Sequence, residues 1–164
     1  NESEQDDKRI TPLMSNQQAQ IIQIVQDILF PNDGNGPGAE DINAFPYLLW
    51  YLQDDLIKEY QRQFILEGAD KLESETQNIF QSSFLELTPE FQNKTIVLLA
   101  KKKRTKLWLS KLLTLIFEAL LTDPSYGGNK NKIGWEWLNH NPGFPRSNPK
   151  NQYPEIIKTV RDEI

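Results

Sequence analysis

The spacing of the apolar residues constrains this chain most, because they recur every three or four positions and show no alternating strand pattern. Such spacing predicts α-helices. The clearest case spans about residues 105–121, where apolar side chains cover much of the helical circumference and predict a central position in the fold: Leu109, Leu112, Leu113, Ile116, Phe117, Leu120 and Leu121. A composition of 20 Leu against 3 Val also favours helix over strand.

Similar spacing predicts four further helices upstream and one short helix near the end of the chain. They are expected at about residues 15–29, 41–60, 61–80, 88–101 and 154–162. Thr88 and Pro89 are typical of a helix start, with a hydroxyl N-cap followed by proline at the first helical position. Gly68 leaves the continuity of the third helix open. We therefore expect an all-α fold of five or six helices in an irregular bundle.

The rest of the chain is expected to divide into a loose end and an ordered loop. Residues 1–14 are polar and charged and predict a loose terminus, followed by a single helical domain over 15–164. Within that domain, residues 123–154 are rich in Gly, Pro and aromatic side chains, which predicts an ordered loop packed over the bundle rather than a linker. The chain begins at Asn1 rather than Met, so we expect an upstream segment that could include a targeting signal.

The composition excludes several kinds of site. The chain has no Cys and a single His, which excludes disulfides, thiolate metal sites and any site that needs two imidazoles. No apolar run approaches the roughly 18 residues of a membrane span.

The charge is distributed unevenly along the chain. Residues 1–82 carry 5 basic and 15 acidic side chains (−10), and residues 83–164 carry 13 basic and 8 acidic side chains (+5). The net charge of −5 argues against a general nucleic-acid-binding protein, while the uneven charge can orient the molecule towards a charged partner.

Three short motifs resemble known sites only in part. The loop at 31–38 starts like a calcium loop at Asp33 but has Ala44 where a bidentate glutamate is required, and it lacks the lysine of a phosphate loop. Asp54 and its neighbour Asp55 are about 100° apart on a helix and cannot converge on one substrate. His140 has no nucleophile beside it in the sequence. We interpret these as a turn-rich connector, a solvated surface and a loop histidine.

The basic run KKKRTKLW at 101–108 has two interpretations. Basic charge beside an aromatic residue is found in proteins that contact nucleic acid or anionic lipid. The same run also fits a solvated helix end or a contact with another protein, and the acidity of the whole chain favours this second interpretation.

The segment that follows the apolar helix is the most informative. It reads Asp-Pro-Ser-Tyr-Gly-Gly-Asn at 123–129, then Gly-Trp at 134–135 and Pro-Gly at 142–143. The Asp-Pro and Gly-Gly-Asn sequences form turns, and the aromatic residues can either hold the loop on its own core or contact a partner. This arrangement resembles the gluconate 2-dehydrogenase subunit 3 family. The motif positions, which are candidate partner contacts, are Asp123, Pro124, Tyr126, Gly127, Gly128, Asn129, Gly134, Trp135, Pro142 and Gly143.

The resemblance implies a small helical subunit with no cofactor and no catalytic residues of its own. Members of that family accompany a large flavoprotein dehydrogenase of the glucose–methanol–choline type, often with a cytochrome c subunit, and commonly carry a twin-arginine export signal for the pair. By this resemblance we expect a non-catalytic accessory subunit, periplasmic or associated with the cell envelope, that supports maturation and export of a partner holding FAD. Two alternatives remain: a stand-alone helical interaction module of the cell envelope with another partner, and an enzyme that uses carboxylates and a hard metal ion.

Overall fold

The computed structural model describes residues 13–143, so the predicted helix at 154–162 and part of the predicted loop lie outside the described residues. The described chain contains six α-helices and no strand, which confirms the all-α class. They are α1 (Asn16–Leu29), α2 (Ala44–Gln53), α3 (Glu59–Phe80), α4 (Pro89–Leu99), α5 (Lys103–Leu121) and α6 (Ile133–Trp137). Three 3₁₀ helices span Phe84–Glu86, Pro124–Tyr126 and Lys130–Lys132.

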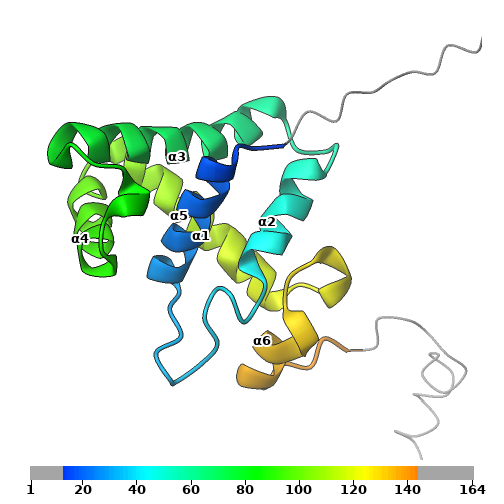
Figure 1. Cartoon of the computed structure of the whole chain (residues 1–164). Helices are drawn as coiled ribbons and strands as arrows, with labels where there is room; N and C mark the ends of the chain where they lie inside the picture. The colour runs from blue at the N-terminus through cyan, green and yellow to red at the C-terminus, as the bar shows by residue number, and fades with distance from the viewer. Residues whose placement is uncertain (1–12, 144–164) are drawn as a thin grey trace, which may run out of the picture.

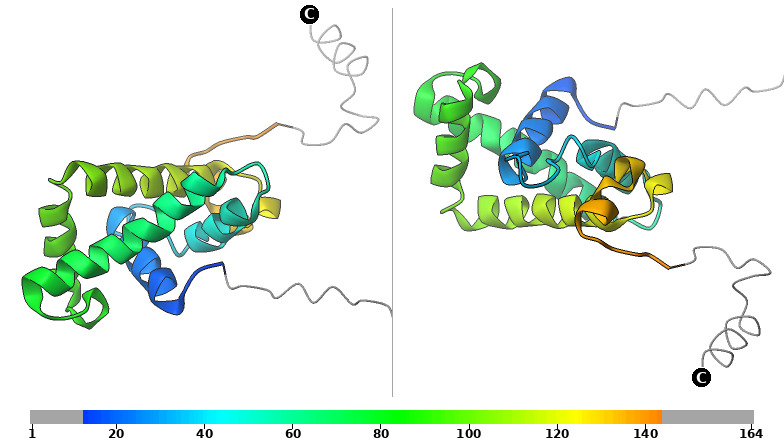
Figure 2. Two further views of the ribbon diagram at one scale, coloured as in Figure 1. Left: turned by 90° about the horizontal axis from the view of Figure 1, so that it is seen from above. Right: turned by 90° about the horizontal axis from the view of Figure 1, so that it is seen from below.

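The long helix α5 is the central element of the fold, as its apolar circumference predicted. It contacts α1, α2, α3 and α6. Its buried side chains include Trp108, Leu112, Leu115 and Ile116, each exposed by no more than 1%. Helix α4 joins α3 to α5 at one end of the molecule, and α6 lies at the other end (Figure 1). In the views from above and below, α5 forms one long side of the bundle, and α1 and α2 pack against its inner face (Figure 2).

The first helix begins where the sequence predicted. Ser15 caps α1 by accepting a hydrogen bond of 3.1 Å from the backbone N–H of Gln18, while the backbone N–H of Ser15 donates to the Gln18 side chain. This reciprocal pair satisfies two of the free donors at a helix start. Leu13 and Met14, which the sequence placed at the end of a loose terminus, pack against the core.

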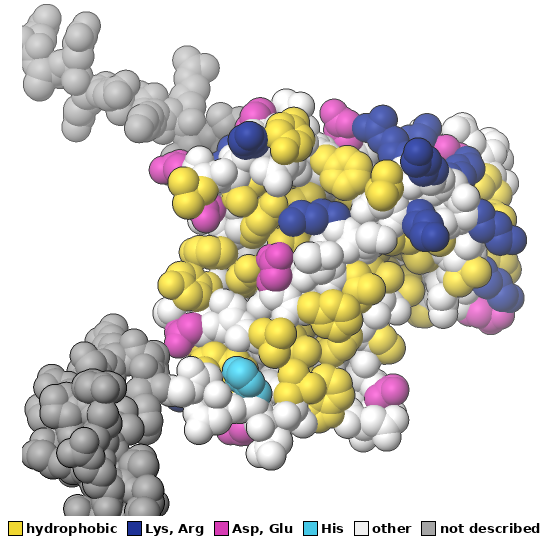
Figure 3. All heavy atoms as spheres, turned by 180° about the vertical axis from the view of Figure 1, so that it is seen from behind, with side chains coloured by type: hydrophobic (Ala, Val, Ile, Leu, Met, Phe, Trp, Pro, Cys, Tyr) yellow, Lys and Arg dark blue, Asp and Glu magenta, His cyan; other side chains and the backbone are white. Residues whose placement is uncertain are grey.

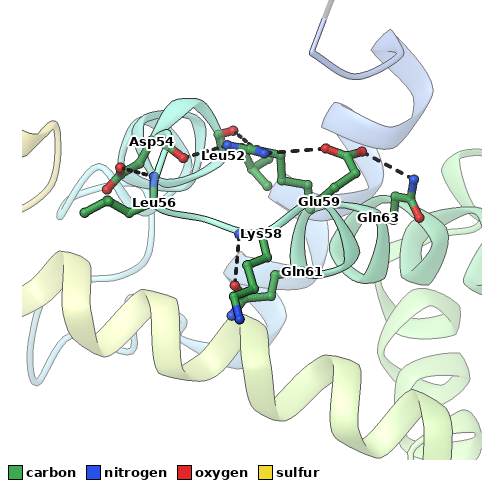
Figure 4. Close-up of polar contacts among 8 residues, drawn as sticks. Leu52, Asp54, Leu56, Lys58, Glu59, Gln61 and Gln63 are labelled. Carbon is green, nitrogen blue, oxygen red and sulfur yellow. Dashed lines mark hydrogen bonds and ion pairs between the residues drawn. The ribbon is translucent and has the colours of Figure 1, made fainter.

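The second helix is shorter than predicted, because it ends at Gln53 instead of continuing to residue 60. Leu56, which fits the apolar stripe, is 86% exposed. The turn after α2 is fixed by Arg62 of α3, whose guanidinium donates to the carbonyl oxygens of Leu52 (2.7 Å) and Asp54 (2.6 Å) (Figure 4). The Asp54 carboxylate also accepts from the backbone N–H of Leu56 (Figure 4). The two Arg62 bonds give partners to carbonyl oxygens at the helix end, and the carbonyl oxygen of Asp54 also accepts from the backbone N–H of Ile57.

The third helix settles a detail that the sequence left open, and the fourth corrects one that it predicted. Helix α3 is continuous through Gly68 over 22 residues. Helix α4 starts with Pro89 at its first position, as predicted, but the hydroxyl of Thr88 forms no capping hydrogen bond. Thr88 contributes only the extended backbone conformation that precedes a helix.

Candidate functional site

The motif segment covers the C-terminal end of α5 and completes its hydrogen bonds. The last carbonyl groups of a helix lack partners within the helix. Here the indole N–H of Trp135 donates to the carbonyl oxygen of Leu121 (2.8 Å), and the amide nitrogen of Asn129 donates to that of Thr122 (3.0 Å). Two of the motif residues therefore cap the central helix from positions further along the chain.

Asn129 links the two halves of the motif. Its side chain is completely buried. The side-chain oxygen accepts a hydrogen bond from the backbone N–H of Gly134 (2.9 Å), while the side-chain nitrogen donates to the carbonyl oxygen of Thr122. The backbone of Asn129 is left-handed, with φ of 44°. Asparagine adopts this conformation at lower cost than most residues, so both its backbone and its amide suit this position.

Two motif glycines are required because the segment lies directly on the backbone of α5. A β-carbon at Gly128 would lie 2.7 Å from the carbonyl oxygen of Ala119, and one at Gly134 would overlap with that of Leu120. Gly127 has a different role, since its φ of 90° closes the 3₁₀ turn before it. The glycines thus allow the close approach that brings Asn129 and Trp135 to the helix end.

The first and last motif residues form local turns. The Asp123 carboxylate accepts from the backbone N–H of Ser125 (2.9 Å), and Pro124 occupies the first position of the 3₁₀ helix. At the other end, the exposed Gly143 donates its backbone N–H to the side chain of Asn141 (3.0 Å). Between these ends lies a shallow hollow of about 480 Å³, which is also lined by Trp135, Pro142 and His140.

His140 belongs to this loop by local contacts. Its backbone N–H donates to the carbonyl oxygen of Trp135 (2.7 Å), and the two rings lie 6.3 Å apart between centroids. The histidine side chain is thus part of the loop surface beside the capping tryptophan, in agreement with the interpretation from sequence.

Helix α6 also holds the loop between α1 and α2. The indole N–H of Trp137 donates to the carbonyl oxygen of Asn35 (2.9 Å), and its ring makes an edge contact with Phe30, with centroids 6.3 Å apart. Gly36 lies directly under the same indole ring, where a β-carbon would overlap it. The glycine-rich loop that the sequence predicted as a connector is therefore a connector packed against the motif segment.

Tyr126 is the motif residue that remains on the surface as a large side chain. It is 47% exposed, and its ring centroid lies 5.0 Å from that of Trp50 in α2, which is itself 37% exposed. Phe117 and Leu121 of α5 are exposed by 46% and 49%. We call Trp50, Phe117, Leu121 and Tyr126 the aromatic face. Hydrophobic side chains gather over the side of the molecule along which α5 runs (Figure 3).

A groove of about 480 Å³ lies within the aromatic face, between α2 and α5. It is lined by Tyr47, Thr114, Phe117, Glu118, Leu121 and Thr122. The Tyr47 hydroxyl donates to the Glu118 carboxylate (3.1 Å), and burial together with this carboxylate raises the pKa of Tyr47 far above its usual range. The phenol therefore stays protonated at physiological pH, and the groove presents apolar surface with one fixed hydrogen bond.

Sequence reasoning found Tyr126 but missed the other members of the aromatic face. It counted Phe117 and Leu121 among the apolar stripe of a central helix, whereas α5 leaves both partly exposed. The available signal was the breadth of that stripe, because a helix that is apolar around most of its circumference exposes apolar side chains wherever no neighbour covers it.

A further cavity, of about 400 Å³, lies between α1 and the start of α2, and both polar and apolar side chains line it. Asp27 and Glu40 line it together with Gln26, whose side-chain nitrogen is buried without a hydrogen-bond partner. Partial desolvation, followed by the charges of Glu40 and Asp41, raises the pKa of Asp27. Across residues 13–143 no group of three or more acidic or histidine side chains is arranged to hold a metal ion.

No helix in the described part of the chain is long and apolar enough to cross a membrane. Comparison with known proteins identifies one family, since the family model described as gluconate 2-dehydrogenase subunit 3 matches residues 16–143. No curated protein and no solved structure matches the chain. The matched residues run from the first position of α1 to the last residue of the motif, well over half of the sequence. The chain therefore belongs to the gluconate 2-dehydrogenase subunit 3 family.

Proposed function

We propose that this chain is a non-catalytic accessory subunit that binds a flavin-dependent dehydrogenase of the glucose–methanol–choline type, acting on a sugar or sugar acid. Membership of the gluconate 2-dehydrogenase subunit 3 family supports the role of subunit. In this proposal FAD lies in the large subunit, which carries out hydride and electron transfer, and a cytochrome c subunit accepts the electrons. The small chain supplies a binding surface and no reacting group.

The aromatic face is the observation that carries this proposal. Its members Trp50, Phe117, Leu121 and Tyr126 are each more than a third exposed, and two of them, Phe117 and Leu121, line an apolar groove. Exposed aromatic residues around an apolar depression are typical of the centre of a protein interface. The end of α5 that carries Leu121 is held in place by hydrogen bonds from Trp135 to Leu121 and from Asn129 to Thr122. A pre-formed surface of this kind loses little conformational freedom on binding.

Maturation and export of the partner form the second part of the proposal. A small subunit that binds the folded dehydrogenase and travels with it places both proteins in the periplasm or at the cell envelope. Family membership is the support for this part. The prediction is that deleting the small chain lowers the amount of active flavoprotein in the periplasmic fraction while leaving its transcript unchanged.

Co-purification tests the proposal directly. The tagged chain is expressed together with a flavoprotein of the glucose–methanol–choline type from the same genome, and the eluate is measured for flavin absorbance. We expect the wild-type chain to bring down flavin, and the double variant Trp50→Ala/Tyr126→Ala to bring down at least about tenfold less, since interface aromatics commonly contribute 2 kcal/mol or more (about 30-fold).

The control for this experiment is Tyr60→Ala/Phe91→Ala, which removes two exposed aromatic side chains (66% and 46%) away from the aromatic face. It should retain the partner. If the wild-type chain elutes without flavin, the dehydrogenase proposal is wrong. Capture of a different envelope protein would then favour the stand-alone interaction module.

A further inference from the structure

A second exposed surface lies where α4 meets α5, at the end of the molecule away from α6 (Figure 1). Five cationic residues occur here within six positions: Lys101, Lys102, Lys103, Arg104 and Lys106. Two of them are paired on the surface, because Lys102 binds Glu75 and Arg104 binds Glu67. The other three are exposed and take part in none of the ion pairs formed among residues 13–143.

Aliphatic side chains stand among these cations. Val97, Leu98 and Leu107 are exposed by 61%, 44% and 54%. Val97 and Leu98 line a shallow hollow along α4 together with Lys101 and with the ion pair of Lys94 and Glu90. We call the surface formed by Val97, Leu98, Leu107 and the three unpaired lysines the basic corner.

The composition of the basic corner differs from that of the aromatic face. Protein interfaces are enriched in Trp, Tyr and Arg and depleted in Lys, which describes the aromatic face and not this corner. Lysines interleaved with exposed aliphatic residues on a helix are typical of surfaces that lie on anionic lipid. We propose that the basic corner binds the surface of an anionic lipid bilayer, with the lysines at the phosphate headgroups and the aliphatic side chains among the upper acyl carbons.

The overall negative charge of the chain does not oppose this binding at physiological salt. Charges interact across water only over roughly 8 Å at that ionic strength, so the field at the corner is set by its own lysines. The Lys and Arg side chains visible on the α5 side gather mainly at the end where α4 lies, apart from most of the exposed hydrophobic side chains (Figure 3). Lipid binding therefore leaves the aromatic face free for a protein partner.

Vesicle sedimentation with the full chain tests the proposal. We expect the protein to pellet with vesicles of phosphatidylcholine and phosphatidylglycerol, to remain in solution with phosphatidylcholine alone, and to be released by high salt. Changing Lys101, Lys103 and Lys106 to Gln together should weaken binding by about tenfold or more. Changing Lys58, Lys130 and Lys132 to Gln removes the same charge far from the corner and should leave binding unchanged.

The aliphatic contribution has its own variant. Val97→Ser/Leu107→Ser keeps every lysine and should also weaken binding, whereas unchanged binding would overturn the insertion of these side chains. Circular dichroism on each variant confirms that it is folded. Equal binding by both lysine variants, or no binding of the wild-type chain to anionic vesicles, would overturn the proposal. Loss of flavoprotein co-purification in the variant with Lys101, Lys103 and Lys106 changed to Gln would also overturn it, because the basic corner would then be a protein interface. Failure to bind vesicles, taken alone, leaves the dehydrogenase proposal intact.

Discussion

Gly68 of α3 lies directly against the indole ring of Trp108 in α5, with no room for a β-carbon between them. The indole N–H of Trp108 donates to the carbonyl oxygen of Ile65, one turn earlier in α3, at 2.9 Å. From the sequence, Gly68 reads as a weak point in a helix. In the structure it is the contact that lets the two longest helices approach each other around a completely buried tryptophan.

Replacing Gly68 with Ala should therefore destabilise the protein by roughly 1–3 kcal/mol, because the cost of overpacking exceeds the gain in helix propensity. Urea denaturation measures the change in free energy of unfolding. The matched control is Ser74→Ala, an exposed position of the same helix, which should change stability by less than about 0.5 kcal/mol. An increase in stability for Gly68→Ala would show that the two helices separate without cost.

Replacing Asn129 with Ala should cost roughly 2–4 kcal/mol, since it removes two buried hydrogen bonds and leaves a left-handed backbone with an unfavourable residue. Asn131 is the matched control, because it is exposed and also has a positive φ of 55°. Asn131→Ala should lose only roughly 1–2 kcal/mol, the cost of the backbone conformation. If the two variants lost the same free energy of unfolding, the capping hydrogen bonds would contribute nothing to the stability.

Trp135 is predicted to act through stability, because it is 8% exposed and bonded to the end of α5. Trp135→Phe should cost about 1 kcal/mol for the lost donor, and Trp135→Ala about 3–5 kcal/mol. Thermal melts measure both changes. Below its melting temperature Trp135→Phe should still retain the flavoprotein. A variant as stable as wild type that no longer binds the partner would instead make Trp135 an interface residue.

The stability of the protein should depend on the ionisation of Asp27. Its pKa is raised in the folded state, so the ionised form is less favourable there than in the unfolded chain, and stability falls as pH rises from the usual aspartate range through the raised pKa. Asp27→Asn should thus be more stable than wild type at neutral pH, with a difference that vanishes near about pH 3. Urea denaturation at the two pH values tests this, with Asp55→Asn as control for net charge.

The apolar spacing alone predicted the all-α class, the start of α1 and the central position of α5. It could not predict the end of α2, because the stripe continues to Leu56 while the helix stops at Gln53. Arg62 in the next helix donates to the carbonyl oxygens of Leu52 and Asp54, and these two bonds depend on tertiary structure. The local signal that the stripe obscured is Asp54, whose carboxylate accepts from the backbone N–H of Leu56 and whose carbonyl oxygen accepts from that of Ile57.

Helix α6 and the caps of α5 were also beyond the reach of the sequence. Residues 133–137 contain a glycine and two tryptophans, which have lower helix propensity than Ala or Leu, and their helix is stabilised by packing on α5 and on the loop before α2. The motif was recognised by residue type, yet its hydrogen bonds join positions that only the fold brings together. The partner contacts expected of the ten motif residues stay predictions.

The bond between Trp137 and the carbonyl oxygen of Asn35 joins positions 102 residues apart. A dehydrogenase that displaced α6 on binding would break this bond and release the glycine-rich loop. Susceptibility of that loop to a protease would then rise in the complex, and tryptophan fluorescence would change with it. The chain thus contains its own reporter of whether assembly leaves the end of the domain in place.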